Sequence, residues 1–133
     1  MAKLAGTWKH VSTEHMEELA ACLGADEELQ RELAAENGDL AIELPDSNTV
    51  SIVWLGSTLM EGGLQKFGEV FDFETPTGIV CKAVLTKESE TKIKAVQTDS
   101  DQQGQMSFEL CQDLLFVTTA YGGVTAISKY RRA

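Results

Sequence analysis

Short strand-like segments follow one another from residue 39 to residue 130, and this succession limits the possible folds more than any other feature. Each segment is strand-like in its pattern, and the stretches between them, such as PDSN, TPTG and DQQG, favour turns. No connection has room for a crossover helix, so each strand is expected to pair with the next in the antiparallel sense. The segments are 39–45, 49–55, 63–67, 69–74, 79–86, 91–98, 105–111, 114–120 and 124–130.

One more strand and a first helix are predicted before this series. Residues 6–11 have strand composition. Ser12 or Thr13 can cap the start of the helix that follows, and Gly24 can end it. Apolar residues recur in this helix at the spacing i, i+3, i+4 and i+7, namely Met16, Leu19, Ala20 and Leu23.

A second helix is predicted directly after the first. Asp26, Glu27 and Glu28 suit the positive N-terminal end of a helix, and the pair Asn37-Gly38 suits its C-terminal stop. Two short helices therefore lie back to back between the first strand and the second.

The complete pattern is ten strands with a helix pair at about 12–37. Ten consecutive antiparallel strands are accommodated more simply as a closed barrel than as an open sheet with exposed edges. We therefore predict an all-β fold, a ten-stranded antiparallel up-and-down β-barrel, in one domain over residues 1–133.

Charge and cysteine content narrow the function classes. With 21 acidic and 11 basic residues the net charge is −10, which disfavours nucleic acids and anionic membranes as partners because both are polyanions. Cys22, Cys81 and Cys111 form no C-x-x-C pair, so neither a disulfide framework nor a zinc site is predicted. Residues 1–10 lack the apolar core of a signal peptide, and no uncharged apolar run approaches the ~20 residues that span a bilayer. We expect a cytoplasmic protein without stable membrane association.

An enzyme is the competing class. Nucleophilic catalysis of the Ser-His or Cys-His type needs a histidine beside a nucleophile, and the sequence offers His10 and His15. Strand alternation leaves open which face of the sheet His10 occupies. Asp72 and Glu74 have the spacing of a carboxylate pair, but no phosphate loop or metal-ligand spacing accompanies them. No enzymatic activity, metal or cofactor is therefore expected.

Alternation along the last strands separates an inner face from an outer face. On the terminal strand Lys129 and Arg131 belong in water, so the other set is expected inside. The predicted inner sets are Val124, Ala126, Ser128 and Tyr130; Met106, Phe108 and Leu110; and Ile93, Ala95 and Gln97. Two strands stay undecided, because Leu115, Val117 and Thr119 compete with Leu114, Phe116 and Thr118, and Val50, Ile52 and Trp54 compete with Val53 and Leu55.

The inner face includes polar residues that a solid core seldom contains: Gln97, Ser128, Tyr130 and, depending on parity, Thr119. A polar group buried without a partner costs about 1–3 kcal/mol. A cavity filled by water or ligand accounts for them. The alternative is a small buried network in which they pair with one another.

Several motifs resemble one family along the whole chain. They are GTWK at 6–9, MEELAACLG at 16–24, FGEVFDFET at 67–75, SFELC at 107–111, LLFVTT at 114–119 and ISKY at 127–130. Together with the order of strands and helices, they are similar to the intracellular lipid-binding proteins, which include fatty-acid, bile-acid and retinoid carriers. Lipocalins share the G-x-W motif, but they are usually longer and secreted and lack the early helix pair.

The resemblance implies a β-clam barrel with the helix pair as a lid, an internal cavity and a portal bounded by the turns at 56–59 and 75–77. Fatty-acid carriers of this family hold the ligand carboxylate with two arginines and a tyrosine, and the matching positions here are Phe108, Ser128 and Tyr130. The deep two-arginine site is therefore expected to be absent. The residues expected to contact a ligand are Tyr130, Ser128, Phe108, Gln97, Thr119, Val117, Met106, Ala126, Met16 and Leu59.

Three ligand classes stay open. The first is a neutral or bulky amphipath such as a retinoid, a sterol-like molecule or a bile-acid-like compound; the second is a fatty acid bound with its carboxylate at the portal; the third is a planar pigment such as a bilin. A barrel that has lost its ligand and acts as a protein-interaction module is the alternative function. We expect a monomer, as is usual for this family.

The predicted helix pair is strongly acidic. Residues 12–37 hold eight acids and one base, Arg31. Such a lid should be repelled by anionic membranes, so ligand transfer through the aqueous phase is expected. An ordinary solvated helix face accounts for the same charges.

Overall fold

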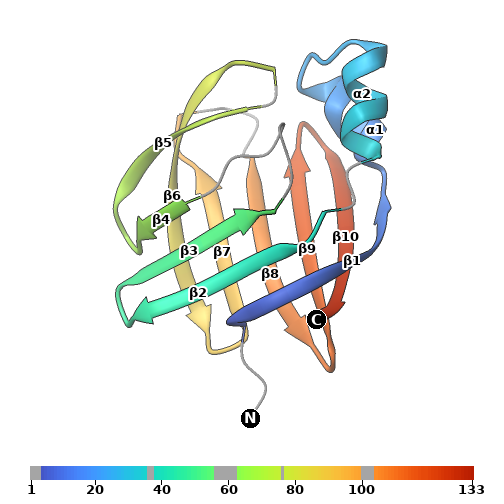
Figure 1. The fold of residues 1–133 in the computed structure, drawn as a ribbon. Coiled ribbons are helices and arrows are strands. Elements are labelled where there is room, and N and C mark those ends of the chain that lie inside the picture. The colour runs from blue at the N-terminus through green and yellow to red at the C-terminus, as the bar shows by residue number, and fades with distance from the viewer. Residues whose placement is uncertain (1–3, 36–37, 56–62, 76, 100–103) are drawn as a thin grey trace.

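The computed structural model describes residues 4–35, 38–55, 63–75, 77–99 and 104–133. Within these residues the elements follow the predicted order of one strand, two helices and nine strands (Figure 1). They are β1 (Gly6–Glu14), α1 (Met16–Cys22), α2 (Glu27–Ala34), β2 (Leu40–Asp46), β3 (Thr49–Trp54), β4 (Gly63–Lys66), β5 (Val70–Glu74), β6 (Val80–Ser89), β7 (Lys92–Gln97), β8 (Gln105–Cys111), β9 (Leu114–Tyr121) and β10 (Val124–Arg132).

All strand pairs are antiparallel, and the order across the sheet is β4-β3-β2-β1-β10-β9-β8-β7-β6-β5. Pairing of β1 with β10 joins the two ends of the chain and bends the sheet into a nearly closed barrel. In Figure 1, β1, β2 and β3 cross in front of β6 to β10, and the two helices lie at one end. The predicted fold class is confirmed; in the described part of the chain, β4 and β5 are the two edges that no ladder joins.

The start of β1 lies at the end of the barrel away from the helices (Figure 1), and Trp8, near this start, is fully buried. Its indole Nε1 donates a hydrogen bond of 2.9 Å to the carbonyl oxygen of Leu4. The guanidinium of Arg132 lies 4.1 Å from the centre of the indole ring and donates a 2.8 Å hydrogen bond to the carbonyl of Ala5. Trp8 belongs to a large core cluster. Its members are Leu4, Trp8, Leu40, Ile42, Val50, Ile52, Leu85, Ile93, Phe108, Leu110, Leu115, Val117 and Tyr130.

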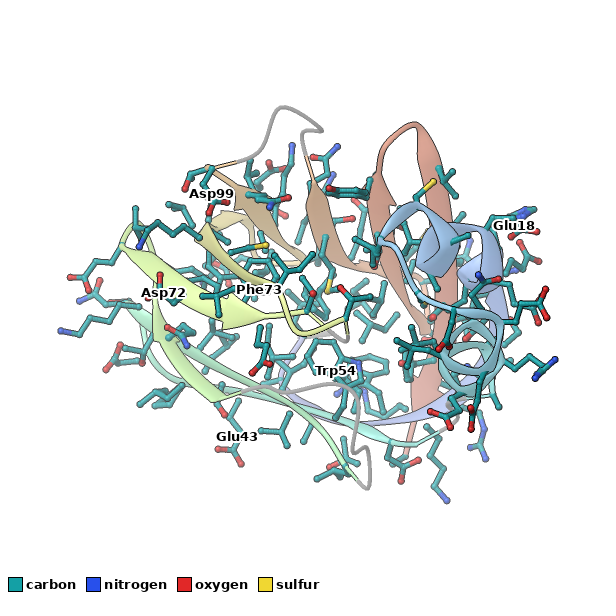
Figure 2. All side chains as sticks on the ribbon, turned by 90° about the horizontal axis from the view of Figure 1, so that it is seen from above. Glu18, Glu43, Trp54, Asp72, Phe73 and Asp99 are labelled. Carbon is teal, nitrogen blue, oxygen red and sulfur yellow. The ribbon has the colours of Figure 1, made fainter. Side chains whose placement is uncertain are left out.

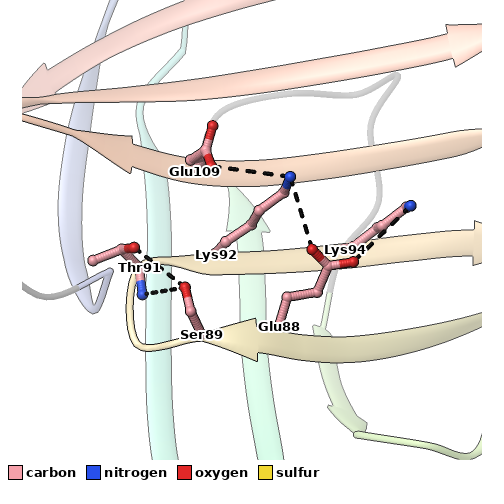
Figure 3. A network of polar contacts seen from close by, with 6 residues as sticks. All are labelled: Glu88, Ser89, Thr91, Lys92, Lys94 and Glu109. Carbon is pink, nitrogen blue, oxygen red and sulfur yellow. Dashed lines mark hydrogen bonds and ion pairs between the residues drawn. The ribbon is translucent and has the colours of Figure 1, made fainter.

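The outer face carries charges in an interlocked set on β6, β7 and β8 (Figure 3). The ammonium of Lys92 lies 3.8 Å from a carboxylate oxygen of Glu88 and 3.9 Å from one of Glu109, while Lys94 lies 4.0 Å from Glu88. These pairs are partly solvated, so each contributes less than about 1 kcal/mol. Their main effect is to keep this side of the sheet in water and the opposite side available for the interior.

The helix pair has a small core of its own, formed by Ala20, Ala25 and Leu33, and α1 packs against β10 and β9. The Asp26 side chain accepts a 2.9 Å hydrogen bond from the backbone N–H of Leu29, as expected for the start of α2. Gly24, with φ of +88°, follows the end of α1 as predicted.

The predicted cap of α1 is wrong. β1 continues to Glu14, so Ser12 and Thr13 belong to the strand, and His15 occupies the cap position with φ of +63° and no side-chain hydrogen bond. Pairing with Lys129 and Ser128 of β10 outweighs the local capping tendency of these residues. α2 is also shorter than predicted because it ends at Ala34; of the expected stop pair, Asn37 lies outside the described residues.

Candidate functional site

The inner face of β8, β9 and β10 brings most of the predicted site residues together. Ser128 on β10 pairs with Val117 on β9, which pairs with Phe108 on β8. Cross-strand partners project to the same face of a sheet, so these three side chains form one row. A second row, Tyr130, Leu115 and Leu110, lies toward the Trp8 end, and a third, Ala126, Thr119 and Met106, lies toward the helices.

Burial settles the parities that the sequence left open. Leu115 and Val117 are buried, so Thr119 also belongs to the inner set of β9; Val50 and Ile52 are buried on β3, which places Trp54 inside. The predicted inner sets of β8 and β10 are confirmed. Figure 2 shows Trp54 and Phe73 pointing into the space that the sheet encloses, whereas Glu18 and Glu43 point away from it.

Phe108 on β8 reaches across the interior of the barrel to a residue of β3. Its ring centroid is 6.1 Å from that of Trp54, although β8 and β3 are not neighbours in the sheet. Phe108 is only 2% exposed and belongs to the large core cluster. Around it the interior is packed, while Met106, Ala95 and Thr119, one row closer to the helices, are half-buried.

β1 contributes two residues that were not predicted as site residues, and a β-bulge places the second of them on the inner face. His10 pairs with Tyr130 and Thr13 with Ser128, and the register shifts between His10 and Ser12. The extra residue, Val11, is exposed and reverses the alternation. His10 and Thr13 therefore share the inner face with Ser128 and Tyr130.

These residues form a hydrogen-bonded chain. Nε2 of His10 lies 2.6 Å from Oγ1 of Thr13, which lies 3.0 Å from Oγ of Ser128. The imidazole also meets the ring of Tyr130 edge to face, with centroids 5.5 Å apart and an interplanar angle of 80°. Ser128 thus has a partner in the protein, Thr13, a residue that the predicted small network did not include.

Electrostatically, the described interior is neutral. Ser128, 8% exposed, is the buried polar residue of the described part of the chain, in which no charged side chain is buried. Burial lowers the pKa of His10 below its usual value of 6.5 and so favours the uncharged imidazole. The site therefore presents hydroxyls and an imidazole, without a fixed cation.

Gln97 lies apart from this cluster. It pairs with Ala83, and its amide donates to a carboxylate oxygen of Asp99 at 3.3 Å. The row of Ser128 reaches β7 at Ile93, four residues from Gln97 and hence about 13 Å along the strand. Gln97 faces inward as predicted but near the rim of the barrel.

Of the two remaining predicted residues, the structure describes one. Met16 packs against the small core of the helix pair and is half-buried. Leu59, with the turn at 56–59, lies outside the described residues. Of the second predicted portal turn, the Thr75 and Thr77 hydroxyls lie 2.9 Å apart. Elsewhere, a shallow groove of about 200 Å³ separates the edge strands β4 and β5.

The described residues contain neither a metal-binding group nor a membrane-spanning helix. No group of three or more His, Cys, Asp or Glu side chains there is placed to hold a metal ion. None of the described helices has the length and apolar character needed to cross a membrane.

Comparison with known proteins gives consistent matches over most or all of the chain. Cellular retinoic acid-binding protein 1 of Takifugu rubripes is 32% identical over 109 residues, covering 81% of this chain and 80% of that protein. A Schistosoma mansoni fatty acid-binding protein in complex with arachidonic acid superposes with a TM-score of 0.86 at 26% identity, covering 100% of this chain and 98% of the other. The fluorescent protein UnaG superposes with a TM-score of 0.81 at 29% identity, covering 97% and 96% of the two chains. No family model matches.

Proposed function

The chain belongs to the intracellular lipid-binding proteins, the family of the cellular retinoic acid-binding and fatty acid-binding proteins, and from this we propose that it is an intracellular carrier for a small hydrophobic ligand with an uncharged headgroup. The observation that carries the proposal is the inner face of β8 to β10, where apolar rows surround the Ser128 and Tyr130 hydroxyls and no charged side chain of the described chain is buried.

The absence of a buried cation among the described residues argues against a deeply bound carboxylate. Moving an ionised carboxylate into a low-dielectric interior costs several kcal/mol unless a cation or several donors receive it. A serine and a tyrosine replace two guanidinium groups poorly, because each has one hydroxyl hydrogen and no charge. The same hydroxyls suit an alcohol, an ester or an amide.

Apolar contact supplies most of the attraction in this proposal. Burying ~15 methylene groups at about 0.8 kcal/mol each gives on the order of 12 kcal/mol, from which binding costs of several kcal/mol are subtracted. Val117, Thr119, Met106 and Ala126 are proposed to line the ligand chain beside Phe108. Gln97, Met16 and Leu59 are proposed to contact the ligand nearer the helix end.

The test uses two ligands that share one chain and differ only in the headgroup. Hexadecanol and palmitate, or retinol and retinoic acid, are titrated at pH 7.5 in a displacement assay, after native mass spectrometry of the protein as purified. We expect one-to-one binding, with the alcohol at least about tenfold tighter than the acid. Tighter binding of the acid would overturn the neutral-headgroup proposal, and loss of binding for every ligand would overturn the carrier proposal.

A barrel without a ligand is the second candidate, and the contact between Phe108 and Trp54 favours it because the two rings fill part of the interior. Thermal unfolding separates the two functions. A carrier gains stability as RT ln(1 + [L]/Kd), whereas a filled interaction module gains none.

A planar pigment is the third candidate, and the similarity to a fluorescent protein favours it. A bound conjugated pigment gives the purified protein an absorption band in the visible range, and bilins added to the colourless protein should produce the same band.

A further inference from the structure

We propose that His10 selects the class of headgroup that Ser128 receives, because the protonation state of His10 sets the direction of the hydrogen bonds in the chain His10–Thr13–Ser128. This inference rests on the proposed function, since it names how the same site distinguishes its ligands. His10 and Thr13 are positioning residues here, and Ser128 is the group that contacts the ligand.

Two directions let every hydroxyl of the chain donate to its neighbour. A protonated His10 donates from Nε2 to Thr13, which leaves the Thr13 hydrogen available to donate to Ser128 and the Ser128 hydrogen available to turn toward the interior. A neutral His10 with its hydrogen on Nδ1 permits the reverse, in which Ser128 donates to Thr13 and Thr13 donates to Nε2. Ser128 then offers lone pairs, which accept from a hydroxyl or N–H headgroup.

Protonation removes the second direction and adds a positive charge two hydrogen bonds from the ligand. Both effects favour an anionic headgroup, which needs donors and a cation. Neutral His10 leaves both directions available without the charge, which suits alcohols and amides. The same barrel can therefore hold a neutral amphipath near pH 7 and gain affinity for an anionic one when His10 is protonated.

The groups around His10 bear on whether the affinity for anions follows the protonation of His10 itself. The phenol of Tyr130 meets the imidazole edge to face, and the guanidinium of Arg132, which pairs beside Tyr130 on the same face of β10, lies over the ring of Trp8. Lys9 and Arg131, paired beside His10, are exposed on the outer face, as is Glu14. Burial is the cause of its lowered pKa, so protonation of the free protein occurs below pH 6.5. Affinity for anions should rise as the pH falls through that pKa.

The test follows the imidazole directly by proton NMR. The chain has two histidines, so the His15→Gln variant leaves His10 as the one titrating imidazole. The His15 side chain is 64% exposed, so its replacement should leave the structure unchanged, and the measurements are made in this variant. The pKa of His10 is measured without ligand, with saturating hexadecanol and with saturating hexadecyl sulfonate, which stays ionised over the whole pH range.

We expect the sulfonate to raise the pKa of His10 by about one unit, equivalent to about tenfold tighter binding by the protonated form, and hexadecanol to leave it unchanged or lower it. A bound sulfonate with an unchanged pKa would overturn the selection by His10 while leaving the carrier proposal intact. Failure of both ligands to bind would instead refute the proposed function.

Two variants separate the effect of the charge on His10 from the effect of the hydrogen-bonded chain His10–Thr13–Ser128. His10→Gln retains a hydrogen-bonding amide without a titrating group, so the ratio of sulfonate to hexadecanol affinity should no longer change between about pH 5 and about pH 8. Thr13→Val keeps the imidazole but interrupts the chain, and the sulfonate-induced rise in the His10 pKa should fall to less than about half a unit. The proposal is contradicted if the affinity ratio keeps its full pH dependence in His10→Gln. It is also contradicted if the sulfonate still raises the pKa of His10 by the full amount in Thr13→Val.

Discussion

Phe108 supports the core from the inner face of β8. It is 2% exposed and contacts Trp54 across the interior. Phe108→Ala should lower the free energy of unfolding of the ligand-free protein by about 3–5 kcal/mol, because it removes a packed ring and leaves a cavity. Urea denaturation measures the loss. Phe73→Ala is the matched control, since Phe73 is 36% exposed and should lose no more than about 1 kcal/mol. Equal losses in the two variants would contradict the packed position of Phe108.

Gly6 has a conformation and a neighbour that together exclude a side chain. Its φ is +138°, and a Cβ atom placed there would lie 2.6 Å from Nη1 of Arg132. Gly6→Ala should therefore destabilise the protein by about 1–3 kcal/mol by straining the backbone and displacing the guanidinium from Trp8. Gly63→Ala, where nothing lies within 4 Å of the added atom, should change the free energy of unfolding by less than about 0.5 kcal/mol. Thermal unfolding of both variants checks the difference.

Sequence alternation identified most inner residues but did not predict the hydrogen bonds that link His10, Thr13 and Ser128. Ser128 and Tyr130 were predictable because β10 alternates without interruption. Thr13 was not, since the bulge at Val11 moves Thr13 inside and Ser12 outside, against strict alternation, and only the pairing with Tyr130 decides the face of His10. A bulge depends on pairing with β10, which is distant in sequence, so a local pattern carries no signal for it.

At the scale of elements, α2 depends on its N-terminal cap. Asp26 satisfies the N–H of Leu29, and α2 spans only eight residues. Asp26→Ala should raise the hydrogen-exchange rate of the Leu29 amide about fivefold, corresponding to about 1 kcal/mol, while the core strands keep their protection. Glu28→Ala, in the same turn but without a capping bond to the backbone, should change that rate less than twofold. A uniform loss of protection over the barrel would show that α2 does not open separately.

The order of elements followed from the sequence, whereas two boundaries did not. Nine strands in succession with short turns left little alternative to an antiparallel barrel, and the comparison with solved barrels agrees. The end of β1 was misjudged because Ser12 and Thr13 favour helix caps in isolation, and only the register with β10 shows that they continue the strand. Tertiary pairing decided this boundary.

For the whole molecule the net charge is acidic, and among the described residues no charged side chain is buried. The net charge is −10, and the described helix pair exposes Glu17, Glu18, Glu27, Glu28 and Glu32 around a single base, Arg31. A carrier can deliver its ligand by collision with a membrane or through the water between them. The repulsion between an acidic lid and an anionic bilayer acts within about 10 Å at 0.1 M salt, so it opposes the collision that direct delivery requires.

Transfer of a fluorescent lipid analogue from the protein to vesicles should therefore have a rate that is independent of vesicle concentration and of the fraction of anionic lipid. Dissociation into water is then the slow step, and stopped-flow fluorescence measures it. The variant Glu28→Lys/Glu32→Lys, changed at two exposed positions of α2, should make the rate rise with vesicle concentration by several-fold when anionic lipid is present. A rate for the unchanged protein that already rises with anionic vesicles would show that the acidic helix pair does not control delivery, and its charges would then be those of an ordinary solvated surface.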